Sequence, residues 1–168
     1  MITKSTPLKE IIELGKECSR KNNCCKYGSG CLAEGDAEKI AKFLKISVNE
    51  LKEKYLEEVE KFNTKLFRPK ILRQSNKTYG TCVFFSGEEC KVHEAKPLEC
   101  KVGSCGRNGE ELSKWFVLNY FVNANDPESI RQYALYSKKN KPLPGGSLKE
   151  LVPDQKRLMK MLKFEILK

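Results

Sequence analysis

The sequence predicts a mainly α-helical protein with a small β-hairpin, in which the helices surround a cysteine-rich loop region. Apolar residues recur at helical spacing over most of the chain, which is typical of amphipathic helices. Residues 66–85 differ, because they are rich in β-branched and aromatic residues. All eight cysteines fall in two segments, residues 18–31 and 82–105. With 168 residues, the chain has the length of one domain of ordinary size.

Apolar stripes and capping residues define the predicted helices. These helices cover residues 7–17, 37–46, 48–62, 111–124, 127–138 and a C-terminal region from residue 147 onward. The residues predicted to start helices are Asp36 and Asp126 as N-caps, the capping-box pair Ser47 and Glu50, the stretch Asn108–Glu111, and the pair Ser147 and Glu150. We expect the apolar stripes to form the hydrophobic core.

The β-hairpin is predicted from two runs of strand-forming residues, 66–74 and 79–85, which the polar sequence SNKT separates. A polar linker with the sequence KKNKPLPGG follows the helix over 127–138. We therefore expect a cysteine-cluster domain over 1–137 and a basic helical extension over 138–168, packed on the domain or tethered to it.

The N-terminus indicates a cytoplasmic protein. Charged residues interrupt it where a signal peptide needs an unbroken apolar run, and the sequence has no stretch of 18 apolar residues. In a reducing cytosol, clustered cysteines more often bind metal or do redox chemistry than form disulfides. A secreted chain would suggest four disulfides, and the Lys- and Glu-rich composition leaves open a hyperthermophile, in which intracellular disulfides occur.

The candidate metal ligands are all eight cysteines: Cys18, Cys24, Cys25, Cys31, Cys82, Cys90, Cys100 and Cys105. Because they form two separated clusters, we expect folding to bring both segments to one metal-binding loop region. We also expect Pro97 to fix the approach of Cys100, because its ring restricts Lys96 to extended geometry.

Cys24 and Cys25 are adjacent, so their Cα atoms lie about 3.8 Å apart and their side chains are expected to diverge. Such a pair suits two metal centres or two irons of one cluster, or one ligand supported by its neighbour. The sequence Gly28-Ser29-Gly30 either allows backbone N–H groups to point at sulfur or forms an ordinary turn.

The cysteine segments resemble those of the CxxCxxCC or YkgJ-type family, which is described as a zinc- or iron-chelating domain. The first match is Cys18, the pair Cys24 and Cys25, and the sequence SGCLAEGDAEKIAKFLKISVNELKEKYL; the second is CVFFSGEECKVHEAKPLEC. The family usually has C-x2-C before the cysteine pair, whereas here five residues separate Cys18 from it. Cys31 is the candidate replacement for the missing ligand. His93 stands where the family often has Tyr, which implies packing or hydrogen bonding rather than obligatory ligation.

The resemblance extends to flagellin lysine methylases, which are thought to carry an iron–sulfur cluster. Thiolates suit both iron and zinc. We favour a [4Fe–4S] cluster, because the irregular cysteine spacings suit a large ligand cage, and keep zinc as the alternative.

The net charge of +10 is the other functional signal. Residues 138–168 hold nine Lys or Arg against three Asp or Glu, so this region carries +6. Such a region either docks on an acidic surface, with protein favoured and RNA possible, or is a solvated face. No nucleophile–base pair and no phosphate-binding glycine loop occurs, so the sequence gives little support for catalysis.

Three functions agree with these observations. The favoured one is a metal-binding accessory or electron-carrying protein that acts with a larger protein complex. The second is a basic nucleic-acid- or ribosome-binding module stabilised by zinc. The third is an enzyme similar to the protein-lysine methylases, although only the cysteine-cluster part of the chain resembles them.

Overall fold

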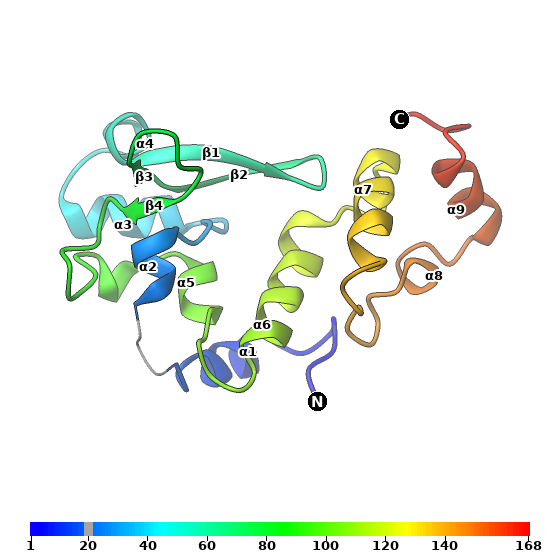
Figure 1. Ribbon diagram of the computed structural model, residues 1–168, viewed down its shortest axis with the longest axis horizontal. Coiled ribbons are helices and arrows are strands. Elements are labelled where there is room, and N and C mark those ends of the chain that lie inside the picture. The colour runs from blue at the N-terminus through cyan, green and yellow to red at the C-terminus, as the bar shows by residue number, and fades with distance from the viewer. Residues whose placement is uncertain (19–21) are drawn as a thin grey trace.

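The computed structural model describes residues 1–18 and 22–168 (Figure 1). Helices dominate the described residues, and the only sheets among them are two antiparallel pairs of strands, which confirms the predicted fold class. The α-helices are α1 (Leu8–Gly15), α2 (Asn23–Tyr27), α3 (Asp36–Leu44), α4 (Val48–Tyr55), α5 (Leu98–Val102), α6 (Gly109–Phe116), α7 (Pro127–Ser137), α8 (Leu148–Leu151) and α9 (Gln155–Leu162). The strands are β1 (Leu56–Lys61), β2 (Thr64–Pro69), β3 (Ile71–Arg73) and β4 (Gly80–Cys82).

The predicted helix over 48–62 is wrong in its second half. The helix α4 ends at Tyr55, and the chain continues directly into β1, which pairs antiparallel with β2 from Leu56–Pro69 to Lys61–Thr64. Phe62 and Asn63 form the tight turn with φ of 51° and 57°. Such left-handed pairs connect hairpins whose strands twist in the normal sense. Pairing with β2 therefore overrides the helical spacing of the apolar residues.

The predicted hairpin over 66–85 is correct in part. Ile71 pairs with Cys82 and Arg73 with Gly80, so β3 and β4 form the expected ribbon. Residues 64–69 belong instead to the first sheet. Glu57 on β1 joins the two sheets, because it accepts hydrogen bonds from Arg68 at 2.9 Å and from Arg73 at 3.1 Å.

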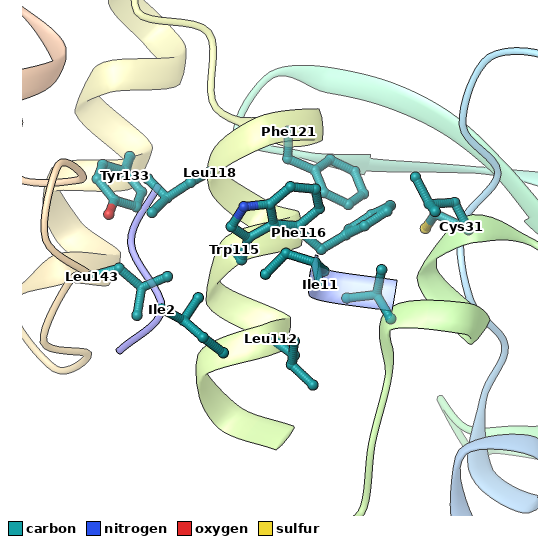
Figure 2. Close-up of a cluster of buried hydrophobic side chains, with 12 residues drawn as sticks. Ile2, Ile11, Cys31, Leu112, Trp115, Phe116, Leu118, Phe121, Tyr133 and Leu143 are labelled. Atoms are coloured by element: carbon teal, nitrogen blue, oxygen red, sulfur yellow. The ribbon is translucent and has the colours of Figure 1, made fainter. Parts of the chain in front are cut away.

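The largest core cluster lies around α6, against α1 and α5 (Figure 2). Trp115 and Phe116 are buried at its centre, and the Trp115 indole donates a hydrogen bond to the Thr6 carbonyl at 3.0 Å. Phe62, at the tip of the β1–β2 hairpin, packs against Tyr133 and Tyr136 of α7. The hairpin thus reaches from the cysteine segments to the middle of the molecule (Figure 1).

Two further clusters complete the core. One packs α3 and α4 against the second cysteine segment; its buried members are Leu32, Ile40, Ala41, Leu51, Leu56, Cys82, Phe84, Val92 and Ala95. The other packs Ile130 of α7 against Val152, Leu158 and Met161 of the C-terminal region. The boundary between 1–137 and 138–168 stays a prediction, but these contacts show how the two parts touch.

Most predicted helix starts agree with the structure. Ser47 accepts a hydrogen bond from the Glu50 N–H, Asp126 accepts one from the Glu128 N–H, and Ser147 with Glu150 forms a full capping box. Asp36 is different, because it is the first residue of α3 rather than its N-cap, which is Gly35. None of the described helices has the length and apolar character needed to cross a bilayer.

Candidate metal centre

Short helices and a strand end position half of the predicted ligands. Cys24 and Cys25 lie on α2, Cys82 ends β4, and Cys100 lies on α5. The helix α2 packs against β4, and the Thr81 hydroxyl of β4 donates to the Lys26 carbonyl of α2 at 3.4 Å. Folding therefore brings the cysteine pair of the first segment to the second segment.

Five of the thiols interact with one another: Cys24, Cys25, Cys82, Cys90 and Cys100, hereafter the five-thiol group. The hydrogen bond from Cys25 lowers the pKa of Cys24 to about 6. The same hydrogen bond, then burial and then the negative charge of Cys24, Cys100 and Cys82 raise the pKa of Cys25. Since charge on one thiolate opposes charge on the next, the group favours a bound cation.

The adjacent cysteines do not diverge as expected. The Sγ atoms of Cys24 and Cys25 lie 3.9 Å apart. Two sulfurs on one tetrahedral ion, at metal–sulfur distances of about 2.3 Å, lie roughly 3.8 Å apart. The pair is therefore spaced for one ion as well as for one ligand with a supporting neighbour.

Backbone hydrogen bonds partly offset the effect of burial on the pKa of three thiols. Burial raises the pKa of Cys82, Cys90 and Cys100. Backbone hydrogen bonds lower these pKa values: those of Phe84 and Phe85 act on Cys82, that of Val92 acts on Cys90, and that of Gly30 acts on Cys100. Such N–H···S contacts stabilise thiolates in metal sites. For Gly30, this agrees with the first of the two roles considered for Gly28-Ser29-Gly30.

Gly30 is the residue that lets the first segment approach Cys100. A Cβ atom at Gly30 would lie 2.6 Å from the Cys100 Sγ and 2.9 Å from the Cys100 backbone nitrogen. No side chain fits that space without moving the backbone of α5. Pro97 caps the same helix and is buried, and Lys96 before it is extended, with φ −52° and ψ 149°, as predicted.

Two carboxylates tie the cysteine segments together. The buried Asp36 accepts hydrogen bonds from the backbone N–H of Ala33 at 2.9 Å and of Leu98 at 2.7 Å. Glu99 accepts one from the Cys31 N–H at 2.6 Å, and its own N–H donates to the Cys31 carbonyl at 3.3 Å. These bonds fix the start of α5, and hence Cys100, relative to the loop that follows α2.

Cys31 lies outside the five-thiol group. Its side chain is 2 % exposed and belongs to the core cluster around α6, at one edge of the cluster in Figure 2. Burial, and then the neighbouring Glu99 carboxylate, raise the pKa of Cys31 to about 12. Cys31 was the candidate for the missing family ligand, but its surroundings are those of a core residue.

Cys18 and Cys105 stand at the outer ends of the two cysteine segments, next to residues that contact each other. Next to Cys18, Glu17 accepts a hydrogen bond from the Asn108 side chain at 3.5 Å. A Cβ atom at Gly106, next to Cys105, would lie 3.1 Å from the Glu17 carbonyl oxygen. The roles of both cysteines as ligands stay predictions. His93, which was not expected to be an obligatory ligand, is exposed.

Sequence reasoning missed the electrostatic role of Lys96 and the hydrogen bonds of Glu99. The positive charge of Lys96 lowers the pKa of Cys24 and Cys90, in each case as a smaller effect than hydrogen bonding and burial. Both residues stand in the stretch AKPLEC between Cys90 and Cys100. The signal for them in the sequence was the presence of charged residues between two predicted ligands, Cys90 and Cys100.

The chemistry of the five-thiol group fits zinc or iron, both of which accept thiolate ligands. Among residues 1–18 and 22–168, no three Cys, His, Asp or Glu side chains already form a ligand set. Metal binding would therefore require the thiols to close around the ion.

Comparison with known proteins agrees with this chemistry. Searches of curated proteins and of solved structures found no match. The model of one protein family, CxxCxxCC, described as a "putative zinc- or iron-chelating domain", matches residues 17–116. The matched range contains all eight cysteines, and therefore the whole five-thiol group. The chain belongs to the CxxCxxCC family of metal-chelating domains.

Proposed function

We propose that the protein is a metal-binding accessory or electron-carrying protein that holds a [4Fe–4S] cluster at the five-thiol group. One cysteine of the pair Cys24 and Cys25, together with Cys82, Cys90 and Cys100, would supply the four thiolates that such a cluster takes. The observation that carries the proposal is the electrostatic interaction of thiols from α2, from β4 and the segment after it, and from α5, together with backbone hydrogen bonds that lower the pKa of three of them. Bound, the cluster would supply one-electron chemistry.

The exposure of Cys24 supports a role in concert with a partner. Cys24 is exposed, whereas Cys82 is buried and Cys25, Cys90 and Cys100 are partly buried. The centre thus has one side at the surface and the other against the core that α3 and α4 form. A centre placed in this way is accessible to a partner protein that exchanges electrons with it.

The test is anaerobic purification followed by absorbance, iron and sulfide analysis. We expect broad absorbance near 400 nm with about four irons and four sulfides per chain. Cys100→Ser is expected to lose most of the iron, and Cys31→Ala serves as the matched control because its thiol lies in the core. A chain without iron or sulfide would overturn the cluster.

Zinc is the second candidate, and the 3.9 Å separation of the Cys24 and Cys25 sulfurs favours it. A colourless protein with stoichiometric zinc would establish a structural site with four thiolates. In that case both Cys24→Ser and Cys25→Ser should lower the zinc content. A cluster would tolerate the loss of one of the two, because it needs a single ligand from the pair.

We further propose that the basic face of α9 docks on an acidic partner protein. The apolar stripe of this region is not available to a partner, because Leu158 and Met161 are buried against Ile130. A shallow hollow remains, lined by Gln155, Lys156, Met159, Lys160, Lys163 and Glu165. Docking would therefore use the basic face alone and not both faces of the helix.

Charge removal tests this docking better than truncation, because removing residues 141–168 would uncover the buried Ile130. We expect Lys156→Gln/Lys160→Gln/Lys163→Gln to lose partners that wild-type protein retains from lysate at low salt, since exposed charges are screened within about 10 Å at 0.1 M salt. Retention of the same partners by both forms at low and moderate salt would leave α9 a structural helix.

A further inference from the structure

An exposed aromatic patch lies beside the five-thiol group. It consists of Tyr27 on α2 with Leu72 and Tyr79 on the β3–β4 ribbon, which are 60 %, 59 % and 47 % exposed. The Tyr27 and Tyr79 rings meet edge to face with their centroids 6.0 Å apart. In Figure 1, α2 lies next to β4, on the same side of the molecule as the other cysteine-bearing elements.

The strand register explains why this patch faces solvent. Leu72 pairs with Thr81, and Ile71 pairs with Cys82. Because side chains alternate along a strand, Ile71 and Cys82 point into the core while Leu72 and Thr81 share the outer face. Tyr79 and Thr81 both contact α2: the Tyr79 ring meets Tyr27, and the Thr81 hydroxyl donates to the Lys26 carbonyl. The patch is therefore a consequence of the register that buries Cys82.

One lysine lies against a ring of the patch, and a second is adjacent to the other ring in sequence. The Lys77 Nζ lies 5.5 Å from the Tyr79 ring centroid, and Lys26 precedes Tyr27 on α2. Within the part of the chain that the structure describes, neither lysine has a carboxylate at salt-bridge distance. Residues 64–87 contain five Lys or Arg and no Asp or Glu. Three of these five pair with Glu57 and Glu58, and the Lys70 amine donates to the Glu53 carbonyl at 2.6 Å. The remaining one, Lys77, lies against the Tyr79 ring.

We infer that the aromatic patch binds single-stranded nucleic acid, with bases stacked on Tyr27 and Tyr79 and phosphates held by Lys26 and Lys77. This activity goes beyond the proposed metal centre and does not depend on which metal is bound. Exposed aromatic rings flanked by cations are the combination by which proteins bind single strands without reading their sequence. Exposed rings can stack on unpaired bases, whereas the bases inside a duplex are already stacked on one another.

A single strand fits this surface better than an acidic protein does. Every base has a flat π-face, and the two rings with their lysines offer stacking and charge at each step along a strand. The total charge of +10 adds long-range attraction for any polyanion. An acidic protein would be recognised mainly by charge, and the rings would contribute little to its binding.

The experiment is fluorescence anisotropy of a fluorescein-labelled 12-nucleotide oligouridylate, titrated with the full chain purified anaerobically with its metal. We expect saturable binding in 50 mM salt that weakens linearly in log–log form as salt increases. Tyr27→Ser/Tyr79→Ser should weaken binding roughly tenfold or more, whereas Tyr27→Phe/Tyr79→Phe should stay within about twofold, because the phenyl rings still stack. The matched 12-base-pair duplex should bind more weakly than the single strand.

Charge variants separate this site from general attraction to polyanions. Lys26→Gln/Lys77→Gln should reduce the salt slope by about 1.4, at roughly 0.7 for each phosphate contact in a single strand. The matched control, Lys156→Gln/Lys160→Gln, removes the same charge from α9 and should change affinity far less. The inference fails if the oligonucleotide does not bind, which is the result expected if the patch binds a protein instead. It also fails if the Ser variants bind like wild type, or if the α9 control loses as much affinity as the Lys26 and Lys77 variant.

Discussion

Asp36 shows how one buried side chain can organise the site. Its Oδ2 atom joins Ala33, just after the first cysteine segment, to Leu98, the first residue of α5. The two N–H groups belong to segments more than 60 residues apart, and Asp36 itself is 3 % exposed. Burial of a charged group is favourable only where such donors surround it, so Asp36 specifies this geometry as well as stabilising it.

We predict that Asp36→Ala lowers the free energy of unfolding by about 2–4 kcal/mol, because two buried N–H groups lose their acceptor. Asp36→Asn should cost less, since its amide oxygen can still accept. Urea denaturation of the metal-loaded protein measures both. The control is Lys39→Ala, which removes an exposed amine 4.0 Å from Asp36 and should cost under about 0.5 kcal/mol. Equal effects of Asp36→Ala and Lys39→Ala on the free energy of unfolding would contradict the role of Asp36 in joining the two segments.

Cys31 and Cys100 should respond differently to substitution, although both were predicted ligands. Cys31→Ala is expected to leave the metal content unchanged and to cost about 1–2 kcal/mol of stability, because it leaves a small cavity beside the core. Cys100→Ala should reduce the metal content, since Cys100 belongs to the five-thiol group. Metal analysis of both variants, with unfolding curves, makes the comparison. Loss of metal from Cys31→Ala would indicate that Cys31 is a metal ligand after all.

The β1–β2 hairpin is the element that connects the cysteine segments to the helical half of the molecule. Near its base, Pro69 accepts a hydrogen bond from Ser29 at 2.6 Å, and Leu32 donates to Phe67 at 2.8 Å. At its tip, Phe62 meets α7, and the Asn63 side chain donates to Asp126 at 2.7 Å. The hairpin is therefore held at both ends.

We predict that Phe62→Ala destabilises the protein by about 1.5–3 kcal/mol. The change removes a ring that packs edge to face on Tyr133 and Tyr136, with centroids 5.8 and 5.4 Å away. Phe67→Ala on the same hairpin is the control, because Phe67 is exposed and should cost under about 1 kcal/mol. Thermal unfolding of the two variants distinguishes them, and equal midpoints would argue that the tip contact contributes nothing.

For the whole molecule, the arrangement of the core implies that bound metal contributes to the stability of the fold. The second cluster packs α3 and α4 against Cys82, Phe84 and Val92, and no regular strand or long helix holds the chain between Cys82 and Leu98. Closing this segment onto α2 is the step for which metal binding supplies free energy.

We predict that removing the metal lowers the thermal midpoint. If occupancy at about a thousand times the dissociation constant contributes roughly 4 kcal/mol, the midpoint should fall by about 10 °C for a chain of this size. Circular dichroism of the reduced protein, before and after chelation, measures the change. Restoring the metal should restore the midpoint; an unchanged midpoint in fully stripped protein would show that the apolar core alone holds the fold.

Local features were predictable from the sequence. The caps at Ser47, Asp126 and Ser147 were identified correctly, because a cap bonds to backbone only two or three residues away. The helical spacing of α1, α3, α6 and α7 and the family motif within residues 17–116 were also visible without the fold. These signals determined the mainly helical class and the metal-chelating family.

The tertiary structure decided what depends on distant partners. The strand β1 has the sequence LEEVEK, which has no strong strand preference of its own, and it is a strand because β2 pairs with it. The arrangement of the thiols has the same cause: packing of α2 on β4 brings Cys24 and Cys25 to Cys82, whereas Cys31 lies in the apolar core around α6. Spacing along the chain identifies thiols that can bind metal, but only packing between segments determines which of them meet, because those contacts join residues 50 to 80 positions apart.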